Sequence, residues 1–212
     1  MLRLSTKNVA YAHIPGYTRL MDKYHHGNLR AALLKAAFHL AAKMENFTLR
    51  EVARRAGVSH NAPYRHFRNK DDLIAALATE SFHQMLAFVR AAVAEVPTPP
   101  DRLRAAARAY LRFALKNPSR FNIMFHSTFD RHAYPDYVAA YTESLALVFE
   151  LLQVHQNLNL DPDTAAELVW ASVHGITGLG MASRLREGNP ENLELLIDAA
   201  IQTLLHGMHS SS

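Results

Sequence analysis

The sequence predicts an all-α protein with a small N-terminal helical unit and a larger C-terminal helical body. Apolar residues recur at spacings of three and four through most of the chain, which is the period of an amphipathic helix. Capping residues and prolines stand where these periodic segments begin. β-branched residues are scattered, and no alternating series indicates a strand. Apolar residues make up 49% of the 212 residues and charged residues 20%, so a sizeable core can form.

The first helix is expected to begin after Asn28, which has a side chain suited to an N-cap. The apolar residues that follow it recur on one stripe: Leu33, Ala37, Leu40, Ala41 and Met44. Residues 1–22 lack such a period and contain the turn-forming pair Pro15-Gly16. We therefore expect these residues to form a flexible tail.

A second, short helix is predicted by the capping box Thr48-Leu-Arg-Glu51. Its buried face is formed by Leu49, Val52, Ala53 and Ala56, and Gly57 is the residue expected to end it with a positive φ. A third helix is expected after Ser59 as its cap, with Pro63 and Phe67 on its apolar side and Val58 pointing inward. Two short helices separated by Gly-Val have the spacing of a helix-turn-helix.

A long fourth helix is expected after Asn69, another residue suited to an N-cap. Its apolar members are Leu73, Leu77, Phe82, Met85, Leu86 and Val89. The segment 96–100, Val-Pro-Thr-Pro-Pro, then interrupts the helical pattern. Further helices are expected at about 101–116, 118–127, 135–156, 162–185 and 191–207, and Pro118, Pro162 and Pro190 stand at the first position of three of them.

Charge is distributed unevenly along the chain. Residues 1–75 carry 13 Lys and Arg against 5 Asp and Glu, whereas the rest carries 10 against 14. The stretch from Arg50 to Lys70 interleaves basic residues with Tyr64 and two histidines. Lysine and arginine neutralise phosphates, and hydroxyl, amide and imidazole groups add directed hydrogen bonds. This pattern on a helix-turn-helix predicts an interface with double-stranded DNA, in which the second helix enters the major groove.

Residues 47–77, FTLREVARRAGVSHNAPYRHFRNKDDLIAAL, closely resemble the N-terminal domain of the TetR family of transcriptional regulators. The resemblance rests on Thr48, on the turn Ala56-Gly57-Val58-Ser59, on Tyr64-Arg65-His66-Phe67, and on Lys70 followed by Leu73. It implies a three-helix DNA-binding domain at 23–72 and a helical effector-binding and dimerisation domain at 73–208, with tails at 1–22 and 209–212. It also implies a ligand-responsive regulator, most often a repressor of a palindromic operator.

The family's DNA contacts can be transferred to matching positions of this sequence. Tyr64, His66 and Lys70 are expected on phosphates, Lys70 with help from the N-terminal end of the next helix, and Thr48 adds a phosphate contact to its capping role. The residues expected at base edges are Arg50, Ser59, His60, Asn61 and Arg65. Arg54 and Arg55 are expected on a solvated face.

The C-terminal half contains one recognisable segment, Trp170-Ala-Ser-Val-His174-Gly175, followed by Gly178 and Gly180. It resembles the Trp…His-Gly signature of a C-terminal subclass of the same family. The glycines permit close approach of another helix, and we expect a two-fold homodimer in which the last two helices form a four-helix bundle. The apolar surface of this bundle is expected from Leu168, Ile176, Leu179, Leu196, Ile197, Ile201 and Leu204.

A pocket for a small apolar or aromatic effector is also expected in this half. Its predicted lining is Phe113, Phe121, Met124, Phe125, Tyr137, Tyr141, Phe149, Trp170, His174 and Met181. The simpler interpretation of aromatic residues at helical spacing is that they form core.

Three other functions remain as alternatives. A metal site would draw on His126, His155 and His174, but these are not spaced as a ligand pair and the chain has no cysteine. An enzyme is disfavoured, since no nucleophile-elbow, phosphate-loop or paired-carboxylate pattern is present. An activator or a nucleoid-type binder without a ligand would share the DNA contacts. We expect no cofactor, no catalytic residue, no membrane span or secretory signal, and a cytoplasmic location.

Overall fold

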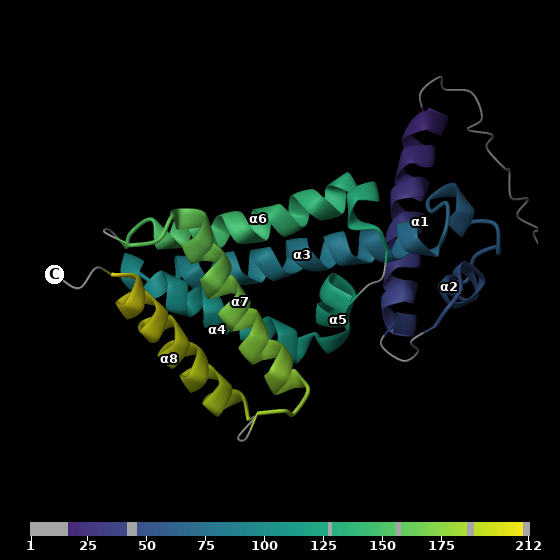
Figure 1. Cartoon of the computed structure of the whole chain (residues 1–212). Helices are drawn as coiled ribbons and strands as arrows, with labels where there is room; N and C mark the ends of the chain where they lie inside the picture. Colours follow the sequence, from purple (N-terminus) through teal and green to yellow (C-terminus); the bar gives the residue numbers. More distant parts are fainter. Residues whose placement is uncertain (1–16, 42–45, 127–128, 156–157, 186–188, 210–212) are drawn as a thin grey trace, which may run out of the picture.

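The computed structural model describes residues 17–41, 46–126, 129–155, 158–185 and 189–209. These residues form eight α-helices, two short 3-10 helices and no strand (Figure 1), which confirms the predicted all-α class. None of these helices combines the length and the apolar character that crossing a bilayer requires.

The N-terminal unit lies at one end of the molecule (Figure 1). It contains α1 (Tyr17–Ala41), α2 (Leu49–Ala56), the 3-10 helix η1 (Pro63–Arg65) and the first turns of α3 (Lys70–Ala94). Its core is a cluster of buried side chains that includes Leu33, Ala37, Phe47, Leu49, Val52, Phe67, Leu73 and Leu77. Of these, Leu33, Ala37, Leu49 and Val52 are the residues expected from the periodicity of the first two helices. The helices of this unit therefore pack around one compact apolar core.

The start of α1 differs from the sequence prediction. The helix begins at Tyr17, so Asn28 lies inside it and is not an N-cap. Residues 17–22 of the expected tail are thus helical, whereas residues 1–16 lie outside the described part of the chain. The periodic apolar stripe begins only at Leu33, whereas the helix itself begins 16 residues earlier, so the stripe does not indicate where the helix starts.

The body contains α3, α4 (Pro99–Lys116), α5 (Pro118–His126), η2 (Arg131–Ala133), α6 (Pro135–Leu152), α7 (Pro162–Met181) and α8 (Pro190–Met208). Five of these helices begin with proline, at the position where a missing N–H costs no helical hydrogen bond. The predicted prolines 118, 162 and 190 are among them. The α6 and α7 helices end four residues earlier than expected, and after α7 Ser183 takes a positive φ of 53° that stops the helix.

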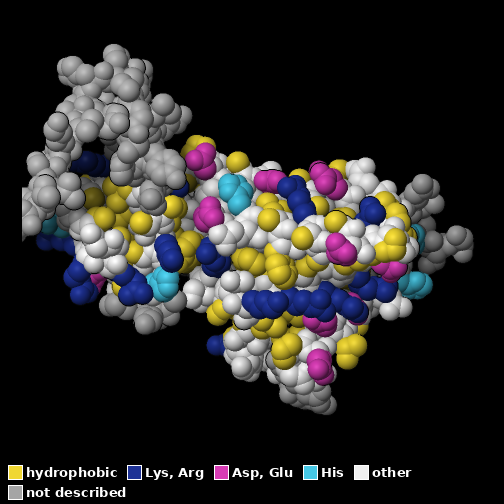
Figure 2. Space-filling model, turned by 180° about the vertical axis from the view of Figure 1, so that it is seen from behind, with side chains coloured by type: hydrophobic (Ala, Val, Ile, Leu, Met, Phe, Trp, Pro, Cys, Tyr) yellow, Lys and Arg dark blue, Asp and Glu magenta, His cyan; other side chains and the backbone are white. Residues whose placement is uncertain are grey.

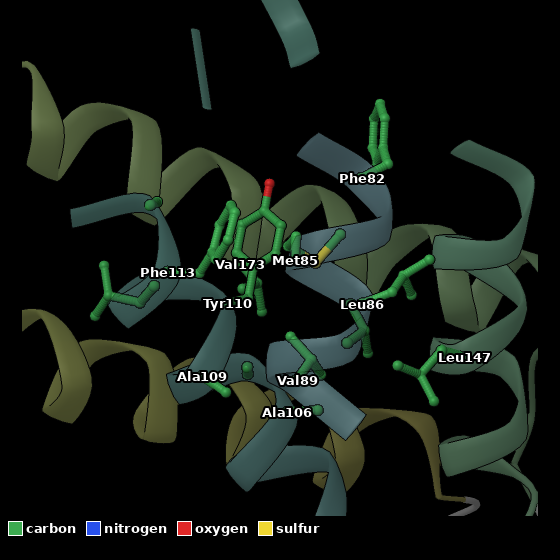
Figure 3. Close-up of a cluster of buried hydrophobic side chains, with 14 of the residues drawn as sticks. Phe82, Met85, Leu86, Val89, Ala106, Ala109, Tyr110, Phe113, Leu147 and Val173 are labelled. Carbon is green, nitrogen blue, oxygen red and sulfur yellow. The ribbon is translucent and has the colours of Figure 1, made fainter. Parts of the chain in front are cut away.

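One helix, α3, belongs to both parts of the molecule. Its first turns place Leu73 and Leu77 in the core of the N-terminal unit. Its later turns place Phe82, Met85 and Val89 in the core of the body. Met85 and Val89 lie near side chains of α4 and α7 (Figure 3), and the ring of Phe82 packs edge-on against Tyr137 of α6. The expected border at residues 72–73 therefore falls within this shared helix.

Two arginine–carboxylate pairs connect α4 with α8. Arg108 and Arg112 on α4 form paired hydrogen bonds with Asp198 and Glu194 on α8; the two from Arg112 measure 2.6 and 2.8 Å. A row of basic side chains with carboxylates beside it is visible on this part of the surface (Figure 2). The Arg112 guanidinium lowers the pKa of Glu194, so the pair is charged at neutral pH. These pairs align α8 with α4 but are partly solvated, so each contributes little to stability.

Gly180 is where α7 and α8 approach most closely. A Cβ added at Gly180 would lie 2.7 Å from both Cδ atoms of the buried Leu193. At Gly207 an added Cβ would meet nothing within 4 Å.

We expect Gly180→Ala to lower the free energy of unfolding by about 1–3 kcal/mol, because Leu193 must leave its position in a packed core. Urea unfolding followed by circular dichroism measures this. Gly207→Ala is the matched control and should not destabilise the protein. Equal effects of the two changes would contradict a close contact at Gly180.

Candidate nucleic-acid interface

The interface begins at a complete capping box at the start of α2. The backbone N–H of Glu51 donates to Oγ1 of Thr48 at 3.2 Å, and the backbone N–H of Thr48 donates to Oε2 of Glu51 at 2.7 Å. The bond from Thr48 lowers the pKa of Glu51, so this carboxylate is ionised at neutral pH. The box fixes where α2 starts and leaves Thr48 and Arg50 exposed beside each other.

The turn after α2 has the predicted left-handed residue. Gly57 has φ 70° and ψ 29°, a conformation that most side chains disfavour. The backbone N–H of Val58 donates to the carbonyl of Ala53 at 3.0 Å. This ends α2 and redirects the chain into the segment that follows.

The segment expected as the third helix is a turn followed by η1, and this prediction was wrong. An α-helix needs a bond from the N–H of residue 63 to the carbonyl of Ser59, but Pro63 has no N–H. That carbonyl instead accepts from the N–H of Ala62 at 2.9 Å, a tighter 3-10 bond. The N-cap of η1 is Ala62, so the expected side-chain cap by Ser59 is absent as well. Pro63 and Phe67 are buried, as expected for the apolar side of the segment.

The tight turn brings most of the predicted contact residues to the surface. Ser59, His60, Asn61 and Arg65 are exposed, and Tyr64 has 51% of its surface exposed although it follows the buried Pro63. An exposed phenol next to buried neighbours is available to a partner. His66 is half-buried and also lines a hollow that faces the body.

Lys70 lies in the first turn of α3, where the side chain of Asn69 accepts from the N–H of Asp72 at 2.8 Å. The ammonium of Lys70 lies 5.1 Å from the ring centroid of Phe47, a cation–π contact that limits where this side chain points. Arg68 forms a two-bond pair with Asp72, at 2.7 and 2.9 Å. This pair lowers the pKa of Asp72 and engages Arg68 within the protein. Arg54 and Arg55 are exposed, as expected for a solvated face.

The predicted pocket residues are brought together only in part. His174 stacks between Trp170 and Phe121, with ring centroids 5.3 and 5.4 Å away and both planes tilted by 20°. Phe125, Tyr137 and Tyr141 join this ring cluster, and Met124 is buried in the same core. These side chains fill space rather than enclose it.

The apolar cavity of the body lies beside that cluster and measures about 50 Å³. Its lining is mostly aliphatic: Met85, Leu86, Val89, Leu103, Ala106, Ala107, Tyr110, Ser144, Leu147, Val148, Leu151, Val169, Trp170 and Val173. Several of these point toward one another in Figure 3. Of the predicted pocket residues, Trp170 lines the cavity.

Sequence reasoning missed Tyr110, which joins the cavity to the ring cluster. Its hydroxyl forms a hydrogen bond with Nδ1 of His174 at 2.8 Å, and its ring packs edge-on against Phe121. Burial raises the pKa of Tyr110, so the phenol stays neutral. Tyr110 lies on the apolar face of α4, between Ala106 and Phe113, and this position in the sequence pattern could have identified it as a buried residue.

An apolar surface remains uncovered on α7 and α8. Leu168, Leu179, Leu195 and Leu196 are between 40% and 65% exposed. A Cβ added at Gly175 or Gly178 would meet nothing within 4 Å. Ile197 and Ile201, which were expected on this surface, are instead buried in the body and pack inward.

Comparisons with known proteins cover both parts of the chain. Residues 33–77 match the family described as "Bacterial regulatory proteins, tetR family", and residues 103–204 match "Tetracyclin repressor-like, C-terminal domain". A protein of unknown function from Rhodococcus sp. RHA1 is 31% identical, with a TM-score of 0.75, over 88% of this chain and 98% of its own.

Two further solved structures share the fold at lower identity. The fatty acid degradation regulator FadR from Bacillus halodurans is 17% identical, with a TM-score of 0.67, over 86% of this chain and 97% of its own. A bacterial regulatory protein in the tetR family from Rhodococcus RHA1 is 19% identical, with a TM-score of 0.62, over 87% and 98%.

The capping box generates a prediction of its own. Thr48→Ala should lower the free energy of unfolding by about 1 kcal/mol, because the backbone N–H of Glu51 loses its acceptor, the Oγ1 of Thr48. Thr48→Ser retains the hydroxyl and should stay close to the parent in the same denaturant titration. A loss of the same size in the serine variant would point to packing of the threonine methyl instead.

Proposed function

This chain belongs to the TetR family of transcriptional regulators, which are not enzymes, and we propose that it is a repressor that leaves a palindromic operator when a small apolar molecule binds. The observation behind this proposal is a set of hydrogen-bond donors on the N-terminal unit: Thr48, Arg50, Tyr64 and residues 59–61 are exposed, and Lys70 is half-buried. They lie on one compact unit whose buried side chains fix its shape.

The proposed contacts divide into two groups. Tyr64, Lys70 and Thr48 would hold phosphates, with His66 as a weaker member because it is half-buried. Arg50, Arg65 and the turn Ser59-His60-Asn61 would read base edges. The tight turn supports this division, since it presents its three polar side chains at one exposed corner. Residues 23–72 would then be the DNA-binding domain and 73–208 the effector-binding domain.

We propose that the uncovered surface on α7 and α8 joins two copies of the chain. Exposed leucines on adjacent helices are costly in water, and a two-fold contact would bury Leu168, Leu179 and Leu196 from both copies. The open space above Gly175 and Gly178 would admit the partner's helix. A symmetric dimer presents two copies of the DNA-binding unit, and a palindromic operator requires two such copies.

The effector would enter the body between α3, α4, α6 and α7. The cavity of about 50 Å³ is far below the roughly 300 Å³ at which ligand pockets begin, so binding must enlarge it. Its aliphatic lining favours a slim apolar ligand, with the Tyr110–His174 pair as the polar end. Expansion would displace α3, the helix that also carries Leu73 and Leu77 of the N-terminal unit. We also propose, from Trp170 and His174, that the C-terminal domain belongs to the Trp…His-Gly subclass of the family.

The phosphate role of Lys70 can be tested without knowing the operator. On a duplex of random sequence, Lys70→Ala should reduce the slope of log K against log salt by about 0.9, the value for one lost phosphate contact. Asn61→Ala is the matched control and should leave that slope unchanged. Fluorescence anisotropy from 50 to 200 mM salt gives both. Identical slopes for Lys70→Ala and the parent would remove Lys70 from the phosphate contacts.

The dimer surface makes a separate prediction. Leu179→Glu should convert the dimer to a monomer of half its mass in analytical ultracentrifugation, because the carboxylate would be buried without a partner. Val138→Glu changes another exposed apolar residue on α6 and should leave the mass unchanged. If the parent chain itself sediments as a monomer at micromolar concentration, the proposed surface does not form a dimer.

A further inference from the structure

A groove of about 690 Å³ lies between α1, α3 and α5, away from the effector cavity. It is lined by Arg30, Ala31, Leu34, Lys35, Phe38, His39, Glu80, Gln84 and Arg120. A neighbouring hollow of about 580 Å³ shares Arg30 and Glu80 with it. Neither the proposed DNA contacts nor the proposed effector site uses this groove.

Arg120 is the residue that distinguishes the groove. Its guanidinium carbon lies 3.9 Å from the ring centroid of Phe38, so the aromatic ring holds the cation in place. Its Nη1 is buried and has no hydrogen-bond acceptor. Burial lowers the pKa of Arg120, and the charge of Glu80 offsets this only in part. A partly desolvated guanidinium without an acceptor is costly, and an anion would relieve that cost.

The charges around Arg120 favour an anion as well. Arg30 and Lys35 line the same groove, and Glu80 is the one acidic residue in its lining. One oxygen of Glu80 accepts a hydrogen bond from the amide of Gln84 at 2.7 Å. Among the described residues, no ion pair within 4.0 Å involves Arg30, Lys35 or Arg120. Three cations therefore face one carboxylate.

The wall formed by α1 is apolar. Ala31, Leu34 and Phe38 lie on successive turns of that helix. Leu34 is buried in the N-terminal core, so the exposed Ala31 and the half-buried Phe38 form the accessible part of the wall. A bare inorganic anion would leave this wall in contact with water, whereas an anion with a hydrocarbon part would cover it.

We propose that this groove is a second ligand site, which binds a small organic carboxylate through Arg120 and Lys35 and covers Ala31 and Phe38 with its hydrocarbon part. An arginine fork matches the two oxygens of a carboxylate. Because α1 belongs to the N-terminal unit and α5 to the body, the bound carboxylate contacts both parts of the chain.

Calorimetric titration of the full chain with benzoate and with hexanoate tests the site. At least one of them should bind saturably at one site per chain, and acetate and inorganic phosphate should bind at least about tenfold more weakly, because they cover no apolar surface. This readout does not require DNA binding or dimer formation, so it is independent of the proposed function.

Three variants locate the binding. Arg120→Gln should weaken it at least about tenfold, by removing the fork. Glu80→Gln should strengthen it about threefold, by removing the nearby negative charge, and a gain of affinity cannot arise from misfolding. Arg104→Gln removes a 41% exposed arginine from α4 and should have no effect.

Three results would overturn the proposal. The first is no saturable binding of either organic carboxylate. The second is binding that neither Arg120→Gln nor Glu80→Gln changes, which would place the carboxylate elsewhere, as in the effector cavity. The third is equal affinity for acetate or phosphate, which would make the groove a site for bare anions only.

Discussion

The helix α3 is the constraint on which the rest of this molecule depends. Leu73 and Leu77 are fully buried in the core of the N-terminal unit, and Phe82, five residues after Leu77, is fully buried in the core of the body. A continuous helix transmits rotation and translation because its backbone hydrogen bonds resist bending. Because both cores pack against this one helix, we propose that a change in the body's cavity alters the position of the residues that follow Lys70.

The shape of the proposed DNA-binding surface depends on the backbone at two residues. Gly57 adopts a left-handed conformation, and Pro63 lacks the N–H that a regular helix would need. Together they produce a tight turn with a short 3-10 helix, in which Pro63 and Phe67 are buried while Tyr64 is exposed. The polar side chains around the turn owe their accessibility to this geometry, and the charge of the segment alone would not provide it.

Local features of the fold were predictable from sequence, and features set by distant contacts were not. The capping box of Thr48 and the prolines that begin α5, α7 and α8 depend on neighbours within four residues, so the pattern alone predicts them. The N-terminal extent of α1 and the inward orientation of Ile197 depend on packing that periodicity does not specify. The ring cluster around His174 illustrates the same limit, since aromatic spacing identified its members but not that they fill the space expected as a pocket.

We propose that two DNA-binding units, each joined to its body by α3, contact DNA as a symmetric pair. Selection of bound duplexes from a random pool by the full chain tests this pairing. An enriched inverted repeat with one fixed spacing is expected, with half-site centres about one helical turn or a whole multiple of a turn apart. Enrichment of single half-sites, of repeats at variable spacing, or of no sequence at all would contradict it.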